Sequence, residues 1–274
     1  MTDSQRFLRD GEIRPADSLT VMDRYVPDGD GPWPVVVLLH GGTMDGHAMA
    51  GVAQAIAERG VIVYTPTYLH GMWDLGAEGV ASGHWAGETL LGDLSCAIRA
   101  ARADALEHGG APEHLVLVGY SMGAGFGATV TLVGDDSDLA VGTSGSCVVS
   151  DGSVVPAAFV GWEGTYDWDA VVATEFPELL DLAPETIQTL GALGHVGRNF
   201  PDDPPPFHLR SGDMAFKGHY HSDFQASFDA ALSAVGWPVT AEVLPDRYHT
   251  AFYQGLPFPE MTDLIVDVAY NPSG

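Results

Sequence analysis

A serine flanked by glycines is the residue of this chain best placed to act as a nucleophile. Ser121 stands in the pentapeptide "GYSMG", directly after the apolar run "HLVLV". The pattern G-x-S-x-G is typical of a tight strand-to-helix turn that lifts a serine hydroxyl above the end of a sheet. Residues two positions before and after the serine must be small, because larger side chains would collide there. Gly119 and Gly123 meet this requirement.

The same glycines also fit a phosphate-binding turn of a nucleotide-dependent oxidoreductase. Gly119, Gly123 and Gly125 form G-x-x-x-G-x-G between a predicted strand and a predicted helix. At least three strands precede this turn, however, whereas the dinucleotide pattern normally follows the first strand. No acidic residue closes the next strand in the register for a ribose hydroxyl. Lys217, the only lysine, has Asp213 rather than a tyrosine four positions before it. The nucleophile is therefore the favoured interpretation.

A serine nucleophile needs an imidazole to accept its proton and a carboxylate to orient that imidazole. Both residue types follow predicted strands: Asp213 ends the run "PPFHLRSGD", and His249 comes after the run "PVTAEVLP". The carboxyl ends of parallel strands share one edge of a sheet, so we expect Ser121, Asp213 and His249 to meet there. Asp167 and Asp169 are rival acids, because the carboxylate can also follow the preceding strand.

The segment "VVVLLHGGT" contains candidates for an oxyanion hole. His40, Gly41 and Gly42 follow a buried strand, and glycines let the backbone turn its N–H groups toward a substrate oxygen. We expect the N–H of Met122, together with that of Gly42 or Thr43, to bind the oxyanion. His40 itself is expected to orient this loop by hydrogen bonding rather than to carry acid–base chemistry.

Strands and helices alternate along the chain in a way that would position these groups. Apolar runs predict strands at 19–27, 33–42, 61–69, 114–119, 155–164, 205–213 and 238–245. Helical patterns predict helices at 47–60, 123–134, 221–236 and 260–270, and a further one from residue 88 to about residue 107. From residue 33 onward this alternation favours parallel strands joined by crossover helices. It predicts one α/β domain over 1–274, in which 165–203 is the candidate for a small cap or lid.

Together these motifs resemble those of the α/β-hydrolases, and are most similar to the esterase/lipase-like and dienelactone-hydrolase-like branches. The resemblance covers nearly the whole chain, since "HGG", "GYSMG", "SGD" and "YHT" occur in the family's order. Two features depart from it: dienelactone hydrolases carry cysteine where Ser121 stands, and Thr43 replaces the third glycine of the H-G-G-G form. The resemblance implies a mostly parallel central sheet with helices on both faces, a small cap or none, and a Ser-His-Asp triad.

The residues and the resemblance predict a serine carboxylic-ester hydrolase that acts on small to medium esters through an acyl-enzyme. A peptidase or a dienelactone-type lactone hydrolase would use the same triad, and a catalytically silent binding protein would keep the same fold. Four aromatic residues are expected to line the substrate pocket: Trp73, Trp85, Trp162 and Phe252. His219 and His221 lack a nearby third ligand, so they predict a polar surface. Neither a metal nor a cofactor is expected.

The chain is strongly acidic, with 37 acidic against 11 basic residues and a net charge of −26. Nucleic acid and anionic membranes would repel it, so neither is expected as a partner. Two interpretations stay open: an acidic protein from a genome that favours arginine over lysine, or adaptation to high salt, which screens the repulsion. The expected partner is a small-molecule ester, and a homodimer is left open.

Two further features concern the compartment of the protein. The first residues, "MTDSQRFLRDGEIRP", contain no apolar core of a signal peptide, and no later run reaches ~18 apolar residues. This favours a cytoplasmic location, although a processed secreted form is left open. Cys96 and Cys147 are too few for a disulfide framework or a zinc site, and are expected to be small buried hydrophobic residues.

Overall fold

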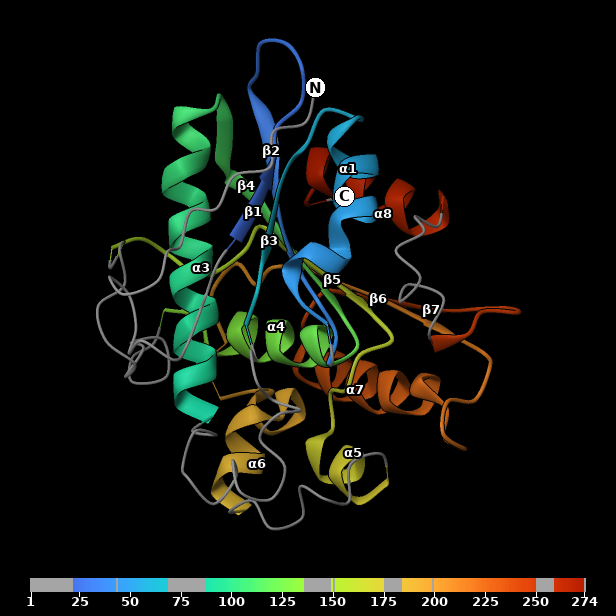
Figure 1. Ribbon diagram of the computed structural model, residues 1–274. Coiled ribbons are helices and arrows are strands. Elements are labelled where there is room, and N and C mark those ends of the chain that lie inside the picture. Colours follow the sequence, from blue (N-terminus) through green and yellow to red (C-terminus); the bar gives the residue numbers. More distant parts are fainter. Residues whose placement is uncertain are drawn as a thin grey trace.

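The computed structural model describes residues 22–42, 44–68, 87–135, 149, 151–174, 184–198, 200–249 and 259–273, with the backbone alone at 87–89 and 186. In this part of the chain seven strands form one sheet in the order β1-β3-β2-β4-β5-β6-β7 (Figure 1). The strands are β1 (Met22–Tyr25), β2 (Trp33–Leu39), β3 (Ile62–Pro66), β4 (Gly110–Tyr120), β5 (Ala158–Trp162), β6 (Phe207–Gly212) and β7 (Val239–Leu244).

All seven predicted strands are confirmed, and those from β2 to β7 are parallel as expected. Only β1 is antiparallel, and it pairs with β3 at one edge of the sheet. The chain passes from β2 outward to β3 and then returns to β4 on the other side of β2. The carboxyl ends of β2 and β4 therefore flank the point where the strand order reverses, which is where open α/β sheets bind ligands.

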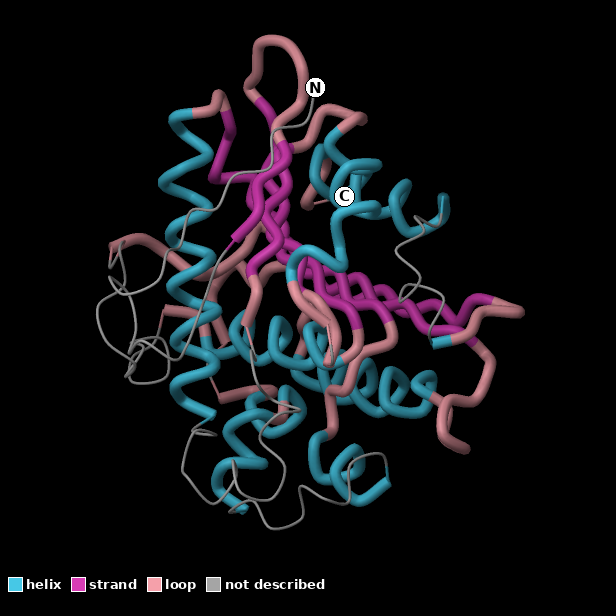
Figure 2. The backbone as a smooth tube through the Cα atoms, viewed as in Figure 1, coloured by secondary structure: helices cyan, strands magenta, loops and turns pink. Residues whose placement is uncertain are grey.

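Continuous apolar strands such as β2 bury both of their faces under helices. Val35, Val37 and Leu39 belong to one core cluster with α3, α4 and α7. Val36 and Leu38 belong to the second cluster, with α1 and α8. This alternation places the twisted sheet between two helical layers (Figure 2), as an α/β architecture requires.

All five predicted helices are present to within a few residues, whereas α5 and α6 lie in 165–203, where no helix was predicted. The helices are α1 (Ala50–Ala57), α3 (Gly87–Glu107), α4 (Met122–Val133), α5 (Trp168–Thr174), α6 (Pro184–Leu190), α7 (His221–Val235) and α8 (Pro259–Tyr270), with 3-10 turns η1 (Gly46–Met49) and η3 (Ala192–His195). Among these described helices none combines the length and the apolar character that crossing a membrane would need. The segment proposed as a cap contains α5, α6 and η3, and α6 packs against α3 and α4.

One feature of the cysteines was not predicted. Cys96 is buried in α3, as expected, and it is also disulfide-bonded. Cys147, the only other cysteine of the sequence, lies outside the described residues. Disulfides are rare in a reducing cytosol, so this bond gives no support to the cytoplasmic location expected from the N-terminal sequence.

Two buried histidines make the stability of the fold depend on pH. Burial lowers the pKa of His208 below its ordinary value of 6.5, and the charge of Arg210 lowers it further. Burial also lowers the pKa of His195 in η3. In the unfolded chain both imidazoles regain their ordinary pKa and bind protons that the folded state excludes. The free energy of unfolding must therefore fall as the pH drops through and below about 6.5.

We expect His208→Gln to weaken this pH dependence, because glutamine has no proton to gain on unfolding. Urea unfolding of the wild type and the variant at about pH 7.5 and about pH 5.5 measures the effect. His114→Gln serves as the control, since His114 is exposed on β4. Equal losses of stability in the wild type and His208→Gln would contradict the prediction.

Candidate active site

The strand-to-helix turn predicted around Ser121 is present. Ser121 is the single residue between the end of β4 at Tyr120 and the start of α4 at Met122. Its φ of 54° and ψ of −120° lie outside the regions that residues with a Cβ normally adopt, a conformation that costs about 1–3 kcal/mol. The Ser121 N–H donates to the carbonyl of Trp162 at 2.8 Å. This bond to the neighbouring strand holds the strained turn in place.

Three glycines allow the backbone segments to approach one another at this turn. A Cβ on Gly119 would overlap the backbone of the first turn of α4, and one on Gly123 would overlap the carbonyl oxygen of His40. A Cβ on Gly41 would come within 3.2 Å of the Cβ of Ser121. The loop after β2 therefore packs directly against the serine, as the small-residue requirement of G-x-S-x-G implies.

His249 lies beside the serine hydroxyl. Its Nε2 is 3.1 Å from the Oγ of Ser121, and the ring is buried. The Tyr120 hydroxyl donates to the carbonyl oxygen of His249 at 2.6 Å. The residue before the serine thus fixes the backbone that carries the histidine, which follows β7.

The other nitrogen of this imidazole faces a buried carboxylate. Nδ1 of His249 is 3.1 Å from Oε2 of Glu163, which directly follows β5 and is 1% exposed. The second oxygen, Oε1, accepts the backbone N–H of Gly212 at the end of β6. With Nδ1–H donated to the carboxylate, Nε2 keeps its lone pair and can accept the proton of Ser121.

Asp213 does not take this place, contrary to the expectation from the sequence. Its side chain is exposed, and its backbone N–H donates to the carbonyl of Leu244 at 3.2 Å. Gly212, the residue before Asp213, donates its backbone N–H to the Glu163 carboxylate. The carboxylate that the structure brings to His249 therefore comes from the end of β5, one strand closer to the serine than the end of β6.

Glu163 escaped the sequence analysis because the predicted strand 155–164 included it. One feature could have identified it: a charged residue at the carboxyl end of the apolar run "AFVGW", followed directly by Gly164. The rival acids considered after this strand lie further along the chain. Asp167 caps α5, since its Oδ1 accepts the N–H of Ala170 at 3.1 Å. Asp169 is exposed in the first turn of α5.

His40 orients the loop after β2, as predicted. Its Nδ1 lies 2.7 Å from the Gly41 carbonyl, and its Nε2 accepts the Tyr68 N–H at 3.2 Å. The carbonyl acceptor requires a proton on Nδ1, so the ring is neutral with a fixed tautomer. The Tyr68 hydroxyl donates to the carbonyl of His40. These bonds occupy both ring nitrogens, which leaves no acid–base role for His40.

The oxyanion-hole candidates are placed only in part. Gly42 is half-buried in the loop after β2, beside the strand-to-helix turn at Ser121. Met122 is the first residue of α4. Thr43 lies outside the described residues. The assignment of these N–H groups to an oxyanion hole stays a prediction.

The aromatic pocket is likewise described at one position only. Trp162 is fully buried on β5, in the core cluster that faces α1 and α8. The structure therefore places this side chain in the sheet core rather than at the surface of a pocket. Trp73, Trp85 and Phe252 lie outside the described residues.

One group of side chains in the described part of the chain has the spacing of metal ligands. Glu163, His221 and His249 each bring one ligand atom to within 4.8 Å of the others. In both histidines, however, Nδ1 faces an oxygen of Glu163: the carbonyl for His221, at 2.7 Å, and the carboxylate for His249. The two Nδ1–H groups therefore bond to Glu163, an arrangement that fits a site for proton transfer.

No protein-family model and no curated protein matches the sequence, but solved structures match the fold over almost its full length. A truncated carbohydrate esterase from gut microbiota is 18% identical with a TM-score of 0.73, covering 99% of this chain and 97% of that one. The apo form of esterase 2 from Thermogutta terrifontis is 15% identical with a TM-score of 0.72, covering 99% and 95%. An acetyl ester-xyloside bifunctional hydrolase from Caldicellulosiruptor lactoaceticus is 17% identical with a TM-score of 0.64, covering 92% and 87%. The chain has the α/β-hydrolase fold.

We expect Gly123→Ala to destabilise the protein by about 1–3 kcal/mol, because the added methyl group would overlap the carbonyl of His40. Urea unfolding measures the change. Gly194→Ala is the matched control, since a Cβ there would meet only the carbonyl of Gln188, at 3.4 Å. An equal loss of unfolding free energy in the two variants would mean that the turn at Ser121 tolerates a larger residue than its packing indicates.

Proposed function

We propose that this chain is a serine hydrolase of carboxylic esters, with Ser121 as the nucleophile, His249 as the general base and Glu163 as the triad acid. The observation that carries the proposal is a continuous line of hydrogen-bonding groups. Oγ of Ser121 lies 3.1 Å from Nε2 of His249, and Nδ1 of the same ring lies 3.1 Å from Glu163. Strained backbone at a buried triad is also a feature of functional sites.

The first half-reaction forms an acyl-enzyme. Oγ of Ser121 attacks the ester carbonyl carbon while its proton passes to Nε2 of His249, which produces a tetrahedral oxyanion and an imidazolium. The Glu163 carboxylate stabilises the imidazolium by accepting the hydrogen bond from Nδ1–H. The imidazolium then gives its proton to the leaving alkoxide as the carbon–oxygen bond breaks.

The second half-reaction repeats these steps with water. His249 accepts a proton from the water, the oxygen attacks the acyl carbon, and the proton returns to Oγ of Ser121 as the carboxylic acid leaves. The oxyanion of both steps would be bound by the N–H of Met122 and that of Gly42 or Thr43. Each such donor is typically worth about 3–4 kcal/mol in the transition state.

The substrate class proposed is a small to medium ester. The structural neighbours named above are described as esterases or as an acetyl ester hydrolase, which supports ester bonds ahead of the amides and lactones that the same triad could cleave. A single imidazole and a single carboxylate in line with the serine match all three reactions, so the leaving group must be established by assay.

We expect the wild type to hydrolyse p-nitrophenyl esters and Ser121→Ala to lose about 10⁵-fold in kcat, because no other group in the triad can form the acyl-enzyme. Rates measured over increasing acyl length would define the acyl preference. Measurements at low and high salt would also show whether the acidic surface requires screening.

A fluorophosphonate that labels serine nucleophiles provides the control for this experiment. Labelling of the wild type but not of Ser121→Ala would exclude a binding protein without activity. Equal ester hydrolysis by both proteins, or none by either, would contradict the ester hydrolase, and amides and lactones would be tested next.

We expect Glu163→Gln to lower kcat by about 10⁴-fold, because an amide cannot hold the imidazolium or fix its tautomer. Asp213→Asn is the matched control, and its kcat should stay within about threefold of the wild type, since Asp213 is exposed. Ester hydrolysis under saturating substrate measures both. A large loss of kcat in Asp213→Asn with little loss in Glu163→Gln would identify Asp213 as the triad acid.

A further inference from the structure

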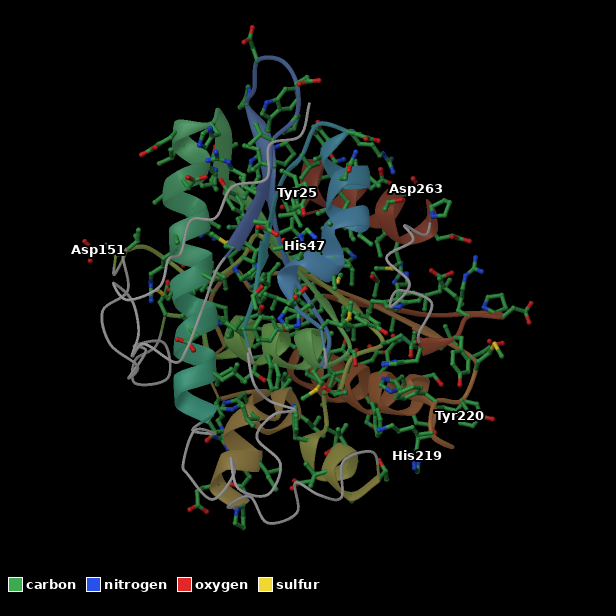
Figure 3. All side chains as sticks on the ribbon, in the orientation of Figure 1. Tyr25, His47, Asp151, His219, Tyr220 and Asp263 are labelled. Atoms are coloured by element: carbon green, nitrogen blue, oxygen red, sulfur yellow. The ribbon has the colours of Figure 1, made fainter. Side chains whose placement is uncertain are left out.

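We propose that His221 is a positioning residue of this site, which holds Glu163 in the conformation that lets its carboxylate reach His249. The inference rests on the proposed function. His221 is the first residue of α7 and is 1% exposed. The sequence predicts a polar surface at His219 and His221, but His221 is buried. Its neighbours His219 and Tyr220 lie at the outer edge of the molecule (Figure 3).

The contact that matters is made with the backbone of Glu163. Nδ1 of His221 lies 2.7 Å from the Glu163 carbonyl oxygen, so Nδ1 carries the proton and donates it. The same nitrogen is 3.9 Å from Oε2 of the Glu163 carboxylate. One imidazole N–H of His221 is therefore directed at Glu163. It comes from α7, a helix that contributes no member of the proposed triad.

Glu163 needs this support because its backbone is strained. Its φ is 53°, a left-handed conformation that glycine adopts readily and glutamate does not. The Glu163 N–H donates to the Arg210 carbonyl at 2.9 Å, and the carbonyl accepts from His221. Both peptide groups of the strained residue are thus bonded, one to β6 and one to α7, which fixes the direction in which the carboxylate points.

His221 also contacts the catalytic imidazole. The ring centroids of His221 and His249 are 4.1 Å apart, and Phe216 lies 4.3 Å from His249. The titratable groups around His221 are Glu163 from β5 and His249 from after β7. Lys217 lies beyond Phe216, with Nζ 5.7 Å from the centre of that ring. The ring nitrogen beside Ser121 is Nε2 of His249, so the general-base role is assigned to His249 and not to His221.

Three substitutions separate the hydrogen bond from the packing. H221N keeps a donor near the position of Nδ1, H221L has nearly the size of H221N without a donor, and H221F keeps an aromatic ring without a donor. H219N is the control, a conservative change at the histidine two positions before α7. We expect H221L and H221F to lower kcat by about 10- to 100-fold with little change in KM, because a misplaced acid affects the transition state more than substrate binding. H221N should lose much less, and H219N almost nothing.

The pH profile distinguishes positioning from a general loss of structure. Without a well-placed carboxylate the His249 imidazolium is less stable, so the acid limb of kcat/KM should move to lower pH in H221L and H221F but not in H221N. Circular dichroism checks the fold of each variant. Either donor-free variant suffices if the other does not fold.

Two results would overturn the proposal: wild-type kcat and pH profile in a folded H221L or H221F, or an H221N as impaired as H221L. A failure of the proposed function is distinguishable, because it would appear in the wild type itself, as no ester hydrolysis or as hydrolysis that does not depend on Ser121. Proton NMR then still tests the positioning, since the downfield Nδ1–H resonance of His249 bonded to Glu163 should persist in H221N and disappear in H221L. Its persistence in H221L would contradict the proposal.

Discussion

The carboxylate of Glu163 is buried where water cannot solvate it, so the protein itself must supply the hydrogen bonds that its charge requires. The donors come from two other parts of the sheet edge: the N–H of Gly212 ends β6, and Nδ1–H of His249 follows β7. Satisfying one buried charge thus brings the ends of three strands to a single point. It also leaves Nε2 of His249 facing Ser121, because the ring has only two nitrogens and the carboxylate takes one.

The backbone at the ends of β4 and β5 has the same unusual form. Tyr120 and Trp162 are the last paired residues of these strands, and the next residue in each, Ser121 and Glu163, has a φ near +54°. Each conformation costs about 1–3 kcal/mol and persists only because its surroundings fix it. The Ser121 N–H is bonded to β5 and the Glu163 N–H to β6. Successive strands therefore hold the two strained residues in register with one another.

The sequence was sufficient for most of the fold because buried parallel strands leave continuous apolar runs, and all seven were found. The start of β4 was missed, since its first residues "GAPE" are not apolar. Ser121 and His249 could be proposed from their places after strands. Glu163 could not be preferred to Asp213 in the same way. The difference lies in which carboxylate is buried and which backbone N–H faces it. A charged residue at the end of an apolar run marks Glu163 as a candidate, but it does not decide between the two acids.

Glu163 and Asp213 follow neighbouring strands, and only one of them is buried. A chain can carry both carboxylates at once, because an exposed aspartate at the end of β6 does not disturb a glutamate that already binds His249. Moving the proposed triad acid from one strand end to the other would therefore not require a chain that lacks a carboxylate at this edge of the sheet. Glu163 reaches His249 from the end of β5 with a longer side chain and a left-handed backbone, so the two positions are not interchangeable by residue type alone. In the proposed triad Ser121 and His249 each have one place on this edge, whereas two neighbouring strand ends carry a carboxylate and burial alone selects between them.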